Sequence, residues 1–459
     1  MPTYSGKFQY MNSDGSVLQA GLCRISFETE SLTLTPASGA PLALDLGDID
    51  LFVPSDYELT LTLYTGRKIL LSQFAKTFQD LCHNLLEAYR KRLLQCLLLE
   101  DLEEVRRFDA FVHLESPERT FSSPAEIRLF KSNLAVLPTQ ANGLQLRLAD
   151  IDAVNFDAAT WTVTIESGNQ KLAFTKLAKR TEEFNERLTT AMLDLTQKGA
   201  ETVHGMFPFL SPDEFQQVAV LMKEGHATAL PKLRAIHPMM EQALATNVVG
   251  ARLKPQFDAL LAHVPGGNYY AGFKQIRKDE GQAAGDGQSQ DSDADEDESS
   301  TPNAAGGDTA ESSGGTAGAE DESPMLHWFF LPVSAKPGEK YPGNIVAWEA
   351  TSRSGRATYF FRLVPPEQGA LLQDASKRPA LIESAIQQLN RAIVLLNFRR
   401  EPIYLPDESL QLQPRFRRYA IACRKLPELV RLRASFLGRA IHTTPEAWQK
   451  QFESYLAKL

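Results

Sequence analysis

Two stretches of the chain, residues 4–105 and 106–200, contain short runs in which apolar and polar residues alternate. The runs are CRISF, SLTLT, LALDL and ELTLTLY in the first stretch and EIRLF, NLAVL, LQLRL and WTVTI in the second. A period of two is typical of β-strands with one face on a core and the other in water. Turn signals such as Asp14-Gly15 and Asn142-Gly143 separate the runs. We therefore expect a small antiparallel sheet or barrel in each stretch.

Each sheet is expected to be followed by one helix, because apolar residues then recur every three or four positions. A helix with such a stripe normally packs against the open side of a small sheet or barrel. The stripe is Phe74, Phe78, Leu81, Leu85 and Tyr89 in the first stretch, and Leu177, Phe184, Leu188 and Met192 in the second.

The two stretches share one sequence register. A gapless shift places Asp48-Ile49-Asp50 on Asp150-Ile151-Asp152 and Gly66 on Gly168, and it also aligns many apolar positions between them. A single register over this length indicates an internal duplication. We therefore expect two tandem modules, at residues 1–105 and 106–200.

The order of elements in each module resembles the pleckstrin-homology-like superfold, which includes bacterial relatives and the GRAM subgroup. Six or seven short antiparallel strands and one closing helix in about 100 residues carry this resemblance, which is one of fold. A different small barrel or sandwich with an appended helix is the alternative. The resemblance implies binding of phosphoinositides, or of peptides and proteins at a strand edge or beside the helix.

Phosphoinositide binding is not expected, because members that bind these lipids place several Lys and Arg between their first two strands. Here the corresponding segments are MNSDGS and ESPERTFSS, in which Arg119 is the one base. The resemblance therefore favours proteins as partners.

Residues 201–278 predict a helical region. Ser211 and Glu214 form a capping box, Pro212 stands in the first turn and Gly225 ends the segment. Residues 279–323 contain 14 acidic residues, no Lys or Arg, and no aromatic residue. Such a composition has almost nothing to bury, so we expect a disordered acidic linker, or alternatively a loop inserted in the C-terminal domain.

Residues 324–459 predict a basic α+β domain with a helical C-terminus. HWFFLPV, NIVAWEA and ATYFFRLV are its expected strands, and NYYAGFKQI, before the acidic segment, is a candidate fourth. A helix is expected from Pro379 to about Asn397. The whole chain is thus expected to be a multidomain α+β protein, and whether this last domain is a third copy of the module stays open.

Basic residues in this last domain are the best candidates for a surface that binds an anion or a partner. The domain has 20 basic and 11 acidic residues, and clustered arginines can neutralise phosphates or an acidic protein. Nucleic acid is a candidate partner, but no nucleic-acid motif is present, so we favour a protein or the protein's own acidic segment. The candidate residues are Arg399, Arg400, Arg415, Arg417, Arg418, Arg424, Lys425, Arg431 and Arg433.

The sequence contains none of the catalytic motifs that we sought. G-x-x-x-x-G-K-[ST], G-x-S-x-G and H-E-x-x-H are absent, so we expect no enzymatic activity, no cofactor and no metal. For the repeated Asp-Ile-Asp we expect the Ile to point inward and both Asp to point to water. Four scattered cysteines and no signal peptide favour a cytoplasmic protein, or a nuclear one in a eukaryote. No apolar run approaches the roughly 20 residues of a membrane span.

These features together predict a non-enzymatic scaffold or adaptor that binds other proteins. One alternative is a chaperone-like binder of basic proteins or nucleic-acid-associated complexes, because tandem modules with acidic tails are similar to histone-chaperone middle domains. Another is peripheral membrane binding, which would require basic loops on the β modules.

Overall fold

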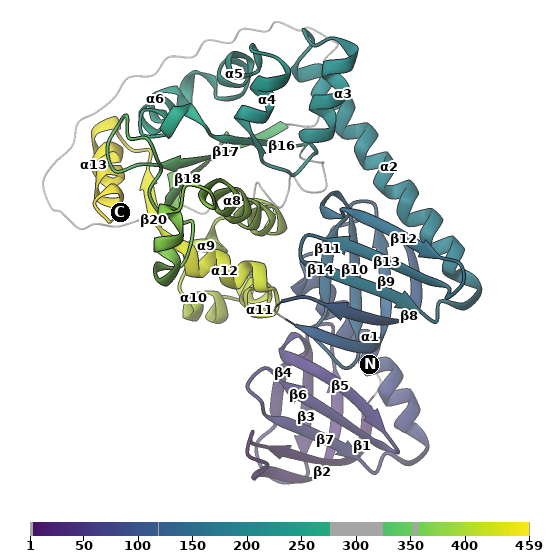
Figure 1. The fold of residues 1–459 in the computed structure, drawn as a ribbon. Coiled ribbons are helices and arrows are strands. Elements are labelled where there is room, and N and C mark those ends of the chain that lie inside the picture. The colour runs from purple at the N-terminus through teal and green to yellow at the C-terminus, as the bar shows by residue number, and fades with distance from the viewer. Residues whose placement is uncertain (1–2, 118, 276–324, 352–356, 459) are drawn as a thin grey trace, which may run out of the picture.

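The computed structural model describes residues 3–117, 119–275, 325–351 and 357–458, and it confirms the expected mixed α+β architecture. Its strands form three antiparallel sheets, two of seven strands and one of six. Figure 1 shows the first sheet at the lower end of the molecule, the second above it, and the third at the upper left with most of the helices.

The first sheet and its helix form module 1, residues 3–96. The sheet curls around its core in the strand order β4-β3-β2-β1-β7-β6-β5, and α1 (Phe78–Cys96) buries Leu81, Leu85 and Tyr89. The expected alternation is present in β3, where Leu32 and Leu34 are buried. The strands are β1 (Thr3–Met11), β2 (Val17–Phe27), β3 (Ser31–Pro36), β4 (Leu42–Asp45), β5 (Ile49–Ser55), β6 (Glu58–Leu63) and β7 (Lys68–Ser72).

Module 2, residues 104–206, repeats this strand order as β11-β10-β9-β8-β14-β13-β12. The equivalent 3-10 turns are η1 (Leu46–Asp48) and η3 (Leu148–Asp150). The helix α2 (Thr181–Met206) runs through residue 200, where the sequence places the end of the module, and extends beyond the sheet (Figure 1). The strands are β8 (Glu104–Glu115), β9 (Thr120–Phe130), β10 (Asn133–Pro138), β11 (Leu144–Arg147), β12 (Ala153–Asp157), β13 (Thr162–Ser167) and β14 (Gln170–Thr175).

The third unit consists of residues 207–275, 325–351 and 357–458. Its sheet has the order β15-β16-β17-β18-β19-β20, which differs from the order in the two modules. The capping box expected at Ser211 and Glu214 is present at the start of α3. The strands are β15 (Thr228–Ala229), β16 (Tyr270–Gln275), β17 (Met325–Val333), β18 (Ile345–Ala350), β19 (Ala357–Arg362) and β20 (Phe436–Ile441). The helices are α3 (Pro212–Leu221), α4 (Leu230–Ile236), α5 (Met240–Ala243), α6 (Gly250–Leu261), α8 (Arg378–Leu395), α9 (Glu401–Tyr404), α10 (Asp407–Leu412), α11 (Arg417–Lys425), α12 (Pro427–Ser435) and α13 (Pro445–Leu456).

Helices cover both faces of the third sheet, which explains why its strands are apolar without alternation. Trp328 and Trp348 belong to the buried cluster that includes α8, α11 and α12, whereas Phe329 and Phe360 belong to the cluster that includes α6 and α13. All six residues of β18 are buried.

The strands β16 and β17 are paired antiparallel neighbours, from Tyr270 opposite Phe330 to Gln275 opposite Met325. The acidic segment therefore connects two adjacent strands of one sheet, which supports the alternative of an inserted loop. The predicted disorder of residues 279–323 lies outside the described residues.

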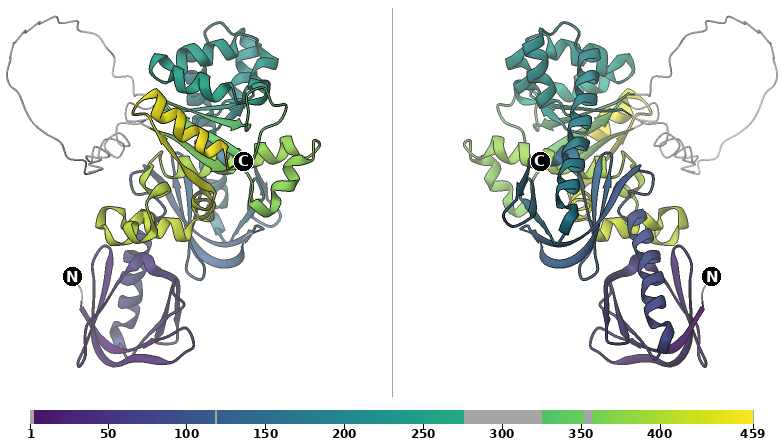
Figure 2. Two further views of the ribbon diagram at one scale, coloured as in Figure 1. Left: turned by 90° about the vertical axis from the view of Figure 1, so that its left-hand side faces the viewer. Right: turned by 90° about the vertical axis from the view of Figure 1, so that its right-hand side faces the viewer.

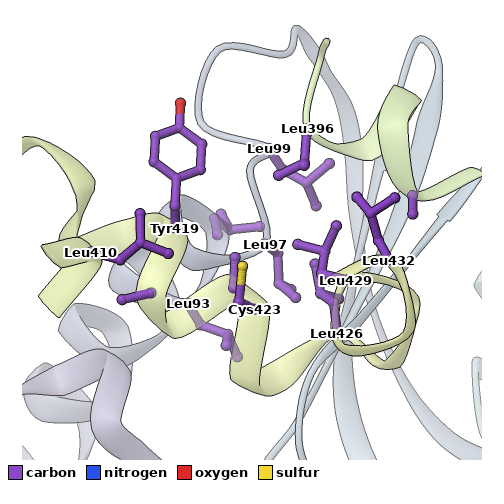
Figure 3. Packing of buried hydrophobic residues seen from close by; sticks show 14 of the residues in the cluster. Leu93, Leu97, Leu99, Leu396, Leu410, Tyr419, Cys423, Leu426, Leu429 and Leu432 are labelled. Carbon is purple, nitrogen blue, oxygen red and sulfur yellow. The ribbon is translucent and has the colours of Figure 1, made fainter. Parts of the chain in front are cut away.

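The core of module 1 continues into the third unit. Leu93 near the end of α1, and Leu97 and Leu99 directly after it, share one buried cluster with residues of the third unit. Those residues include Cys423 of α11 and Leu429 of α12. Figure 3 shows these side chains pointing toward one another, and both views in Figure 2 place the yellow-green helices α11 and α12 directly above module 1. The two parts are therefore packed together as one body. Within the described ranges, no helix is long and apolar enough to span a bilayer.

Candidate functional site

The Asp-Ile-Asp of module 1 lies under the basic helix α11. Asp48 ends the turn η1 and is only 9% exposed. Its two carboxylate oxygens accept hydrogen bonds from Arg424 Nη2 at 2.5 Å and from Arg417 Nη2 at 2.7 Å. The Arg424 guanidinium also stacks 3.9 Å from the ring centre of Tyr64. Two of the predicted basic residues thus bind the protein's own first module.

Lys425, at the end of α11, joins all three units. Its ammonium group is buried and donates to Asp50 Oδ1 at 2.8 Å, to the Ile49 carbonyl at 2.9 Å and to Asn142 Oδ1 of module 2 at 3.2 Å. A lysine has three N–H donors, and these three acceptors use all of them.

The Asp-Ile-Asp of module 2 makes a second contact with the third unit. Asp150 is 7% exposed and accepts a bidentate pair from Arg147, at 2.7 and 2.6 Å. His226 Nε2 lies 2.9 Å from Asp150 Oδ1, and Arg391 of α8 lies 3.9 Å from Oδ2. Arg147 also donates to the Gly225 carbonyl, which accepts from Asn390 of α8 as well.

The two buried aspartates differ in their pKa. Burial raises the pKa of Asp48, and the charges of Arg417 and Arg424 only partly offset that rise. Burial would also raise the pKa of Asp150, but the Arg147 guanidinium and a hydrogen bond from His226 outweigh it and hold this pKa well below its usual range. Asp150 is therefore the more firmly ionised of the two.

The expectation that both Asp of each triplet point to water is wrong for Asp48 and Asp150. Each of these residues ends a 3-10 turn instead of lying inside a strand, so the alternation rule does not apply to its side chain. Their partners are distant in sequence, because Asp48 pairs with residues more than 360 positions away. Arg147, three residues before Asp150, was the one local signal of a buried pair.

The other predicted basic residues lie in several different places. Arg433 binds Asp407 at 2.7 Å and the carbonyls of Pro402 and Leu405. Arg418 pairs with Glu100 of the segment after α1. Arg400 lies 5.9 Å from the ring centres of both Trp348 and Tyr359, and burial lowers the pKa of Arg431.

Two predicted residues remain more open. Arg415 is exposed, lies over the ring of Phe416 and donates to Gln413. Arg399 is half-buried beside a cavity. The nine residues therefore do not form one continuous basic surface. Four of them hold the third unit against module 1 and the segment that follows it through paired charges, which fix geometry as well as adding energy. These four are Arg417, Arg418, Arg424 and Lys425.

Neither comparison identifies a relative: no model of a known protein family matches the chain, and a search of curated proteins finds no match.

Proposed function

We propose that the protein is a non-enzymatic interaction scaffold that binds an extended peptide segment along β12 of module 2. In this proposal both modules are pleckstrin-homology-like. Seven antiparallel strands followed by a helix, in the same order in both copies, support that assignment.

The observation that carries the proposal is a difference between two equivalent strand edges. β5 ends the sheet of module 1, and its edge is already in use: Phe52 N–H donates to the Thr139 carbonyl of module 2 at 3.0 Å. β12 ends the sheet of module 2 and pairs only with β13 within the described residues. An open edge of this kind offers backbone donors and acceptors to an added strand.

Aromatic side chains beside this edge provide an apolar surface that a side chain of the bound peptide would contact. Trp161 is 49% exposed and packs against Phe156 of β12, with ring centres 6.3 Å apart. Large aromatic residues carry much of the binding energy in protein interfaces. Backbone pairing along β12 together with a contact to Trp161 would give both affinity and register.

The alternatives have less support. A nucleic-acid surface on the basic helices is disfavoured because Arg417, Arg424 and Lys425 are already paired with carboxylates of module 1. For membrane binding, the loop between β1 and β2 contains no base. Burial lowers the pKa of Arg119, the one base in the equivalent loop of module 2, so that residue is partly withdrawn from water.

A peptide-display selection on the immobilised full-length chain tests the proposal. We expect enriched peptides with apolar residues at alternate positions. Bound peptide should slow hydrogen exchange of β12, and Trp161→Ser should weaken binding at least tenfold.

Tyr57→Ser is the matched control, because Tyr57 is 70% exposed at the end of the equivalent hairpin turn in module 1. Its affinity for the peptide should equal that of the wild type. Peptides that bind Trp161→Ser and the wild type equally well, or that protect a different strand, would contradict the proposal.

A further inference from the structure

A cavity of about 180 Å³ lies where module 2 meets the third unit. Module 2 contributes Asn133, Leu148 and Met192 to its wall, and the third unit contributes Leu396 and Arg399. An apolar cavity of about 150 Å³ is large enough to admit benzene. The space is therefore sufficient for a small organic molecule.

The wall of this cavity is apolar in part and positively charged in part. Leu148, Ile151, Met192, Leu195 and Leu396 supply apolar surface. The basic side chains outnumber the acidic ones by five to three. They are Arg147, Lys223, Lys274, Arg399 and Arg418, against Glu100, Asp101 and Glu224.

Most of these cations are already bound within the protein. Arg147 is held by Asp150, Arg418 pairs with Glu100, and Lys274 donates to Asn397. The side chains of Arg399 and Lys223, in contrast, have no ion pair or hydrogen bond with the part of the chain that the structure describes. Arg399 is half-buried, so a charge-assisted bond from an anion would compensate its partial desolvation.

Gly199 of α2 keeps one side of the cavity open. A Cβ at this position would meet only the backbone nitrogen of Glu224, at an ordinary 3.7 Å, so packing does not require glycine there. Alanine would also favour the helix by about 0.5–1 kcal/mol. The missing side chain enlarges the space between α2 and the segment that contains Glu224.

We propose that this cavity binds a small amphipathic anion, a carboxylate or phosphate ester on an apolar body. The anionic group would contact Arg399 and Lys223, and the apolar body would lie against Met192 and Leu195. Such a ligand touches module 2 and the third unit together, so its binding stabilises their contact by mass action. This site is separate from the β12 edge, and it does not depend on peptide binding there.

Isothermal titration of the full-length protein with octanoate, octyl phosphate and octanol tests the proposal. We expect saturable binding of one molecule of octanoate or octyl phosphate, and the tighter of the two identifies the anionic group. Octanol should bind at least tenfold more weakly, because it lacks the charge that Arg399 compensates. No saturable binding of either anion, or equal affinity for octanol, would overturn the proposal.

Two variants and a control test whether the ligand binds in this cavity. Arg399→Gln should weaken binding of the anion at least tenfold, and Gly199→Leu should abolish it by filling the cavity. Arg415→Gln removes the same charge from an exposed arginine outside the cavity wall and should leave the affinity unchanged. Far-ultraviolet circular dichroism checks that each variant folds. Wild-type affinity in a folded Arg399→Gln variant would refute the assignment.

Discussion

At the scale of single residues, the charges that hold the units together are few and almost completely paired. Lys425 satisfies its three donors with acceptors from module 1 and module 2. Asp150 is surrounded by Arg147 and His226. Buried ion pairs add little net stability relative to apolar packing, but the loss of one partner is costly because the other charge stays buried. These residues therefore set the relative position of the units more than they increase total stability.

The lowered pKa of Asp150 predicts an acid-sensitive contribution to stability. The ordinary value of this carboxyl is 3.8. Below that pH the unfolded chain binds a proton that the folded protein does not, so the free energy of unfolding falls by up to about 1.4 kcal/mol per pH unit. Asp150→Asn removes this group. The variant should have a lower free energy of unfolding than the wild type. This difference should be largest above about pH 5 and should shrink as the pH falls through about 4 toward 2.

Urea unfolding followed by tryptophan fluorescence at several pH values measures this deficit. A deficit that stays constant across the acidic range would show that the folded protein does not hold Asp150 ionised.

At the scale of helices and strands, the sequence predicts well what depends on neighbouring residues. Alternation identifies β3 and β6, and helical spacing identifies α1 and α8. In the third sheet, β16 to β19 are predicted from their aromatic content, because burial on both faces removes the alternation. The two edge strands, β15 and β20, are not predicted, and β20 lies where the sequence indicates helices. The contacts of the predicted basic residues cannot be predicted from such local patterns. The docking of α11 on η1 depends on contacts between elements that are far apart in the chain, and no sequence periodicity reveals such contacts.

Close approach of α11 to η1 requires a glycine at position 47. A Cβ there would lie 2.7 Å from Cys96 Sγ and 2.9 Å from Ile421 Cδ1, so α1 or α11 would have to move. We expect Gly47→Ala to lower the free energy of unfolding by about 1–3 kcal/mol, as overpacking usually does. The shift in the urea midpoint measures this effect.

Gly205→Ala is the matched control, because nothing lies within 4 Å of its added Cβ in α2. This change should leave stability unchanged or raise it by about 0.5–1 kcal/mol. Equal midpoints for Gly47→Ala and the wild type would show that the approach of α11 is looser than the structure indicates.

At the scale of the whole molecule, module 1 and the third unit share one hydrophobic core. The cluster extends from Phe8 and Leu61 in the first sheet, through Leu97, to Leu429 and Trp348 in the third unit. Module 2 contributes Phe130, Ala135 and Leu137 to this cluster, but most of its buried side chains form a core of their own, which contains Phe174 and Leu188. Module 1 therefore shares buried side chains with α11 and α12, although these helices are more than 300 residues away in the sequence. Opening of this contact should expose apolar surface on both sides.

Leu97→Asp tests whether that shared core holds the molecule together. Leu97 directly follows α1 and is fully buried against α11 and α12 (Figure 3). A carboxylate at this position cannot ionise without water. The cheapest response is for α11 and α12 to separate from module 1. Hydrogen exchange should therefore become at least tenfold faster in β5, α11 and α12, while β13 and β14 in the core of module 2 keep their protection.

Leu193→Asp is the control, because Leu193 is 65% exposed on α2 and the same charge there should change no exchange rate in these elements. Equal acceleration in all three sheets would mean that the molecule unfolds as a single unit instead of separating at this contact.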